Sequence, residues 1–199
     1  IVEGIVFGCT DGATTFNTAL GYNALLAPTA SGIANVAIGS SAGNAVTDGY
    51  GNTLIGPGTG CSVTTGTVNT AVGIGALCGV TSGFANLGVG ICSGCAYITE
   101  SGNAVFGGYY GDPGDTNSLI LSDGAGNLKA KFDSLGALSF DGTTYGTAGQ
   151  VLSSNGAGAK PTWIAAGGSA ATPTVAGIVL GCTVAGSTAL GCKSLLSRT

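Results

Sequence analysis

The sequence predicts an all-β chain organised around a parallel β-roll, or β-solenoid, with 17-residue coils. Two observations carry this prediction. A five-residue phrase occurs six times between residues 17 and 107: Asn, a small residue or Thr, a small or aliphatic residue, a large apolar residue, and Gly. From Gly39 onward, the glycines that close the phrase recur with a period of 17. A fixed period this short is typical of a solenoid, in which each coil buries its apolar face against its neighbours.

The first and last residues of these phrases form the expected structural ladder. They are Asn17, Asn35, Asn52, Asn69, Asn86, Asn103, Gly21, Gly39, Gly56, Gly73, Gly90 and Gly107. We expect the asparagine amides to bond between coils or to cap the turns, because asparagine ladders stabilise stacked strands. Each phrase is predicted to be one strand, and stacked coils should advance by about 4.8 Å.

A second strand is expected in each coil, seven residues past the glycine. The residues there are Val46, Val63, Val80 and Tyr97, each followed by Thr or Ile. Further glycines stand seven residues before the glycine of the phrase, at Gly32, Gly49, Gly66 and Gly83. We expect these at corners that require a positive φ, which glycine adopts without steric cost.

The predicted strand is apolar on both faces, which indicates that both are covered. One face carries large side chains, at Leu20, Ile38, Ile55, Val72, Val89 and Phe106, and the other carries Ala19, Ala37, Ala71 and Gly88. We expect the large side chains to fill the coil interior and the small face to contact another chain. The alternative is a single-chain roll with a tapered interior.

The cysteines follow the same register. Cys61, Cys78 and Cys95 stand five residues past the glycine in three successive coils and so form a column. Small buried apolar residues are the favoured interpretation, although a disulfide spans Cα separations of about 4.4–6.8 Å, which includes the coil spacing. Cys92 and Cys95 form a C-x-x-C motif, but it lacks the second pair or the His of a zinc site. No metal site is therefore expected.

The period stops after Gly111, and the composition changes. We assign residues 1–111 to the solenoid, 112–148 to a small antiparallel β-meander, and 149–171 to a hairpin followed by a Gly/Ala/Ser linker. Residues 172–199 are assigned to the start of a second solenoid module, because 175–183 closely repeat 2–10. A long filament of tandem modules of about 170 residues is the natural inference from this restart.

The meander should contain strands over 119–121, 128–132 and 137–140, separated by turn-forming stretches. We expect Lys129 and Lys131 to alternate outward on the middle strand. The hairpin should turn at Asn155 and Gly156, with Trp163 as its apolar anchor.

The Asn-x-Ala-[Ile/Leu/Val]-Gly coils resemble the head repeats of trimeric autotransporter adhesins. They resemble more closely the Asn-Thr-Ala-[Leu/Ile/Val]-Gly arrays of phage and virus tail-fibre-like proteins, and residues 149–163 look like a segment that recurs in phage tail fibres. This resemblance implies a homotrimer of intertwined parallel β-rolls that binds surfaces and catalyses nothing. The 17-residue coils and the abundant Cys depart from the adhesin pattern.

The composition argues against several classes of function. The chain has no His, which removes the commonest general base, and Asp112 and Asp115 flank a turn, so no catalytic residue, cofactor or enzyme activity is expected. A net charge of −4 without a basic patch disfavours nucleic acid. The longest apolar run, 175–186, is too short to span a bilayer, which needs about 20 residues. The absence of a signal peptide and of an initiator Met suggests a processed piece.

Three hypotheses for function remain. The first is a structural fibre segment of a virion or phage tail, acting as shaft and surface-attachment element at the virion surface or outside the cell. The second is a bacterial trimeric surface adhesin or extracellular filament subunit; in both, a host-surface glycan or protein is a candidate partner. The third is an ice- or glycan-binding solenoid, disfavoured because the Thr column is interrupted. Its threonines are Thr18, Thr53 and Thr70, and Val36, Leu87 and Ala104 break it.

Overall fold

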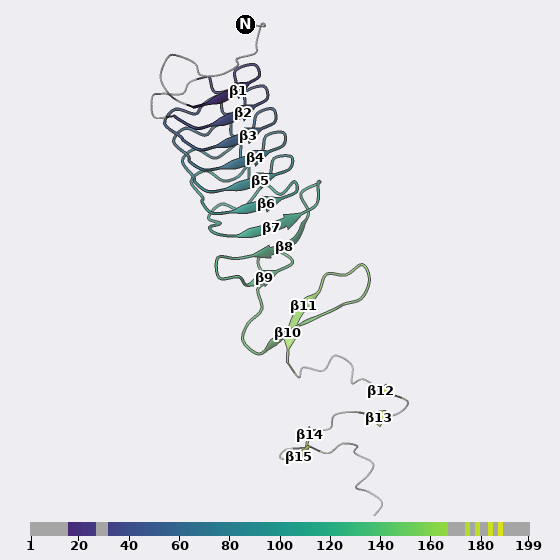
Figure 1. Ribbon diagram of the computed structural model, residues 1–199. Helices are drawn as coiled ribbons and strands as arrows, with labels where there is room; N and C mark the ends of the chain where they lie inside the picture. Colours follow the sequence, from purple (N-terminus) through teal and green to yellow (C-terminus); the bar gives the residue numbers. More distant parts are fainter. Residues whose placement is uncertain are drawn as a thin grey trace, which may run out of the picture.

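A computed structural model describes residues 16–26 and 32–166, together with the backbone of four two-residue strands between 174 and 188. The predicted all-β parallel solenoid is confirmed. Nine strands form one sheet in sequence order, and a two-stranded hairpin follows it (Figure 1). In the described part of the chain, no helix is long and apolar enough to cross a membrane.

Six three-residue strands form the stacked part of the sheet. They are β1 (Thr18–Leu20), β2 (Val36–Ile38), β3 (Thr53–Ile55), β4 (Thr70–Val72), β5 (Leu87–Val89) and β6 (Ala104–Phe106). Neighbouring strands are parallel and in step, so that Thr53 lies opposite Thr70 and Ile55 opposite Val72. Each strand is the predicted phrase between its Asn and its Gly, and each coil therefore advances the chain by one rung of the ladder.

The meander continues the solenoid sheet. Strand β7 (Leu119–Ser122) pairs parallel with β6, and β8 (Leu128–Phe132) and β9 (Leu138–Ser139) then pair antiparallel. All three predicted strands are present. Because β7 belongs to both the parallel stack and the meander, the meander closes one end of the solenoid sheet (Figure 1).

The predicted second strand in each coil is wrong. Val46, Val63, Val80 and Tyr97 are fully buried, but they lie outside the strands. The reason is visible in the hydrogen bonds that follow them: the N–H groups of Thr64, Thr65 and Gly66 all donate to the carbonyl of Thr81, at 2.9, 3.3 and 3.1 Å. A backbone whose successive donors converge on one acceptor curls around it and cannot extend into a ladder.

The two strand faces are the reverse of the prediction. The residues that point into the coil are the small set, with larger residues in some coils: Ala19, Ala37, Leu54, Ala71, Gly88, Val105 and Ile120 are all buried. The large residues on the other face are partly exposed, as Ile55 at 37% and Phe106 at 40% show. The interior is narrow because buried residues from the opposite turns, such as Leu25 and Leu77, already fill it.

Two kinds of glycine shape the coils. The glycines that end the strands have φ between 103° and 139°, and each stacks directly on its equivalent in the next coil. Gly49, Gly66 and Gly83, expected at positive φ, are not in that region. Glycine is required at these three positions because the backbones of adjacent coils approach closely there. A Cβ at Gly66 would lie 2.7 Å from the carbonyl oxygen of Gly83.

The hairpin pairs β10 (Gln150–Ser153) with β11 (Thr162–Ala165), and Leu152 lies opposite Trp163. The connection, residues 154–161, is longer than the expected tight turn. The indole N–H of Trp163 donates to the carbonyl of Leu138 at 3.1 Å, which ties the hairpin to the meander.

Four further strands pair antiparallel as β12 (Thr174–Val175) with β13 (Ile178–Val179), and β14 (Thr183–Val184) with β15 (Ser187–Thr188). The predicted restart of the solenoid at 172–199, and its counterpart at residues 2–10, otherwise lie outside the described residues.

Candidate functional site

The six repeat asparagines form a buried, continuous ladder. In each middle rung the side-chain oxygen accepts hydrogen bonds from the backbone N–H and the amide of the next Asn. Asn52 Oδ1, for example, accepts from Asn69 N at 3.0 Å and from Asn69 Nδ2 at 3.1 Å. The second amide hydrogen of Asn69 reaches the corner carbonyl of Gly83 at 2.9 Å. Each middle side chain thus bonds to the coils on both sides of its own and holds the corner of the next coil, so both predicted roles are present.

The ladder ends where the meander begins. Asn103 Nδ2 donates to the carbonyl of Asp115 at 2.9 Å, and Asn103 Oδ1 accepts from the backbone N–H of Ser118 at 3.1 Å. Ser118 precedes β7 as each Asn precedes its strand, so it occupies the next rung. Its short side chain cannot continue the ladder, and the ladder stops at this rung.

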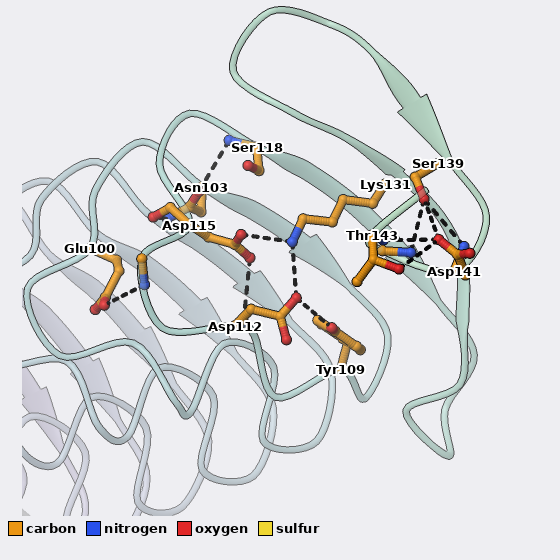
Figure 2. A network of polar contacts seen from close by, with 12 residues as sticks. Glu100, Asn103, Tyr109, Asp112, Asp115, Ser118, Lys131, Ser139, Asp141 and Thr143 are labelled. Carbon is orange, nitrogen blue, oxygen red and sulfur yellow. Dashed lines mark hydrogen bonds and ion pairs between the residues drawn. The ribbon is translucent and has the colours of Figure 1, made fainter. Parts of the chain in front are cut away.

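A charged network closes this end of the solenoid (Figure 2). Lys131, on β8, is only 4% exposed, and its ammonium group lies 2.7 Å from Asp115 Oδ1 and 2.9 Å from Asp112 Oδ2. The hydroxyl of Tyr109 donates to Asp112 Oδ2 at 2.8 Å, and that of the buried Tyr97 lies 3.4 Å from Asp115 Oδ2. The network therefore fastens the 112–115 loop to the meander.

The charges of this network stabilise one another. Burial alone would lower the pKa of Lys131, but the carboxylates of Asp115 and Asp112 outweigh it, and the pKa is raised. Partial burial would raise the pKa of Asp112, but the Lys131 ammonium and the Tyr109 hydroxyl lower it below its usual range. Burial, with the hydrogen bond to Asp112, raises the pKa of Tyr109 to about 12. Lys131 is thus held protonated between ionised carboxylates, a state suited to binding the loop rather than to nucleophilic or base chemistry.

The prediction that Lys131 points outward is wrong, whereas Lys129 is exposed and pairs with Asp123 at 2.9 Å. One feature of the sequence marks the coil at which the regular stack ends: Tyr97 stands where earlier coils have Val46, Val63 and Val80. Its larger ring fills the last coil, and a Cβ at Gly111 would lie 2.5 Å from it.

The outer face of the sheet runs without interruption from β1 to β7. Its outward strand residues alternate with the buried ones, and none of them is charged: Thr18, Leu20, Val36, Ile38, Thr53, Ile55, Thr70, Val72, Leu87, Val89, Ala104, Phe106, Leu119 and Leu121. Exposed apolar side chains such as Val68, Ile74 and Ile91 stand beside this outer face in the flanking turns. Exposed apolar surface of this continuity is typical of contact sites.

The cysteines of the predicted column lie on the turns, each half-buried. Cys78 Sγ lies 3.0 Å from Cys95 Sγ, and Cys61 Sγ lies 3.7 Å from the carbonyl oxygen of Cys78. Within residues 16–26 and 32–166, no three His, Cys, Asp or Glu side chains are grouped so that they could hold a metal ion.

No family model, characterised protein or solved structure matches this chain at a significant level. The resemblance of its repeats to adhesins and tail fibres therefore stays a hypothesis.

Proposed function

We propose that this chain is a structural segment of a fibre, a homotrimeric shaft and surface-attachment element of a virion or phage tail. The observation that supports this most is the uncharged, apolar outer face of β1–β7, which runs along the whole described stack. A parallel sheet usually has both faces covered. In this chain the inner face is covered by the turns of its own coils, and the outer face is left for a partner.

A second copy of the chain is the partner that fits best. The outer face repeats at the same 17-residue spacing as the coils, so two identical stacks present matching rungs along their length. It carries no charge that would select an oppositely charged partner. The number three comes from the resemblance of the repeats, and the module restart at residue 175 extends the same arrangement into a filament.

A bacterial trimeric adhesin or extracellular filament subunit is the alternative, and the same apolar face supports it equally. The flanking sequence separates the two: a membrane anchor on the C-terminal side indicates an adhesin, and a baseplate-attachment or chaperone segment indicates a fibre.

The oligomeric state tests the proposal. We expect light scattering to give the mass of a trimer for the chain at micromolar concentration. Ile55→Lys, on the outer face of β3, should dissociate it, because each copy would bring a charge into the contact. Ile98→Lys is the matched control, since Ile98 is 55% exposed in a turn away from the strands. A monodisperse monomer for the unchanged chain would refute the fibre proposal.

A further inference from the structure

Three thiols meet in adjacent coils, in the turns that follow β4 and β5. Cys78 and Cys95 occupy equivalent positions 17 residues apart, and their sulfur atoms are 3.0 Å apart. Cys92 lies three residues before Cys95 in the same turn, and its carbonyl accepts a hydrogen bond from the N–H of Cys95 at 3.2 Å. All three cysteines are half-buried, so small reagents can reach them.

The backbone geometry of the two positions suits a cross-link. The N–H of Cys78 donates to the carbonyl of Gly75 at 3.2 Å, and the N–H of Cys95 donates to that of Cys92 at 3.2 Å, so both cysteines end the same type of turn. Equivalent residues in adjacent coils are about 4.8 Å apart, within the range of about 4.4–6.8 Å that disulfide Cα atoms span. The bond therefore requires little movement of the coils.

We propose that Cys78 and Cys95 are a covalent cross-linking site, at which a small-molecule disulfide oxidises the two thiols to a bond between adjacent coils. The Cys78 thiolate attacks the small disulfide, forms a mixed disulfide and releases one small thiol. Cys95 then attacks Cys78 Sγ, loses its proton to solvent and releases the second small thiol. Two protein thiols are oxidised by two electrons, and one disulfide is reduced to two thiols.

The order of the two steps follows from the surroundings of the sulfurs. Burial, followed by the hydrogen bond with Cys78, raises the pKa of Cys95, so its thiolate is scarce and it is a poor first attacker. Held beside the mixed disulfide, it needs no encounter from solution. Cys61 has the same register, but its Sγ contacts the Cys78 carbonyl oxygen at 3.7 Å, whereas the sulfur of Cys95 already lies 3.0 Å from that of Cys78, so Cys95 is the favoured partner.

Peptide mapping tests this site on the intact folded chain. The chain is incubated with oxidised glutathione, remaining thiols are blocked with N-ethylmaleimide, and the denatured protein is cut with chymotrypsin. Because Phe84 lies between the two cysteines, cleavage there separates them unless they are bonded. We expect a linked peptide pair containing Cys78 and Cys95, lighter by two hydrogen atoms than the separate thiol peptides.

Single substitutions identify the partners. Cys95→Ser and Cys78→Ser should abolish the linked pair, whereas Cys61→Ser and Cys92→Ser should leave its yield unchanged. A chain in which Cys92 pairs with Cys95 or Cys78 would overturn the assignment. Mixed disulfides with glutathione that never resolve into a linked pair would overturn it as well, as would recovery of all the thiols as N-ethylmaleimide adducts.

Discussion

Gly88 and Leu77 share one space inside the solenoid: a Cβ at Gly88 would lie 2.9 Å from Leu77 Cγ. Two coils earlier the sizes are exchanged. There the strand carries Leu54 and the equivalent turn position carries Gly43, where a Cβ would lie 2.7 Å from Leu54 Cδ1. The turn that follows Leu54 also carries a glycine, Gly60, where a Cβ would lie 2.8 Å from Leu54 Cδ2. Each of these two facing pairs therefore holds one leucine, which the turn supplies in one pair and the strand in the other.

Exchanging the two residues, with Gly at position 77 and Leu at position 88, should preserve the fold. Gly88→Leu alone should destabilise the chain by about 1–3 kcal/mol through overpacking, and Leu77→Gly alone by about 2–5 kcal/mol through the cavity it leaves. The double variant reproduces the Leu54 arrangement, because Gly94 already stands where Gly60 stands in that coil. It also relieves the positive φ of Leu77, 51°.

Denaturant unfolding of the four proteins measures the coupling. We expect the double variant to be at least about 1 kcal/mol more stable than the sum of the single effects predicts. Simple addition of the two losses would show that the two positions do not share space.

This exchange explains what the sequence could and could not predict about the coils. The Asn-to-Gly period fixes the coil length and the parallel register, because both follow from spacing alone. Alternation along the strand identifies two faces but not which one is inside. That depends on the turns, since Leu25 and Leu77 fill the interior and leave room only for small residues such as Ala71 opposite them. Ala71 is therefore an interior residue of its own coil and not part of a contact between chains.

The burial of Lys131 beside Asp112 and Asp115 could not be predicted from the sequence for a similar reason. Alternation on β8 suggested that Lys129 and Lys131 share the solvent face, and a hydrogen-bond partner lying 16 or 19 residues earlier leaves no periodic signal. The turn predicted at 112–115 is present, and its two carboxylates also serve as counter-ions to Lys131. The asparagine ladder, in contrast, repeats in every coil and was predictable from the sequence.

Removing one rung of the ladder should cost more than a surface hydrogen bond. Asn69→Ala leaves the carbonyl of Gly83 and the backbone N–H of Asn86 without their partners inside the coil. Each buried unsatisfied group costs about 1–3 kcal/mol, so a loss of about 2–5 kcal/mol in the free energy of unfolding is expected. Asn127→Ala, at an exposed turn, is the control and should stay within about 1 kcal/mol. Equal losses for the two variants would show that the ladder contributes no special stability.

The two lysines of β8 allow a matched comparison. Lys131→Met keeps the apolar stem but leaves Asp115, whose side chain is 11% exposed, without its counter-ion. Breaking a buried ion pair costs about 3–5 kcal/mol, and the half-exposed Asp112 places the expected loss near the lower end. Lys129→Met breaks an exposed pair with Asp123 and should cost at most about 1 kcal/mol. Backbone amide hydrogen exchange at β7 and β8 should become faster in Lys131→Met and not in Lys129→Met. Amides of β7 and β8 that stay protected in Lys131→Met would contradict the role of the network in closing the solenoid end.

The pH dependence of the same variants isolates the charges. Asp112 has a lowered pKa, so its stabilisation is complete above its unfolded pKa of about 3.9 and is lost as pH falls through the folded value. Lys131 has a raised pKa, so its stabilisation is complete below its unfolded pKa of about 10.4 and is lost as pH rises through the folded value. Between about pH 5 and 9 the stability difference between the unchanged chain and Lys131→Met should be constant.

Below about pH 4 this difference should shrink, because a protonated Asp112 no longer pairs with Lys131 while the unchanged chain still buries its ammonium group. Glu100, Asp123 and Asp141 titrate in both proteins, so their effects largely cancel in the difference. The free energy of unfolding of both proteins, measured in urea from pH 2 to pH 9, gives the curve. A difference that persists undiminished at pH 2 would mean that Lys131 stabilises the solenoid end through the packing of its stem, and not through Asp112 and Asp115.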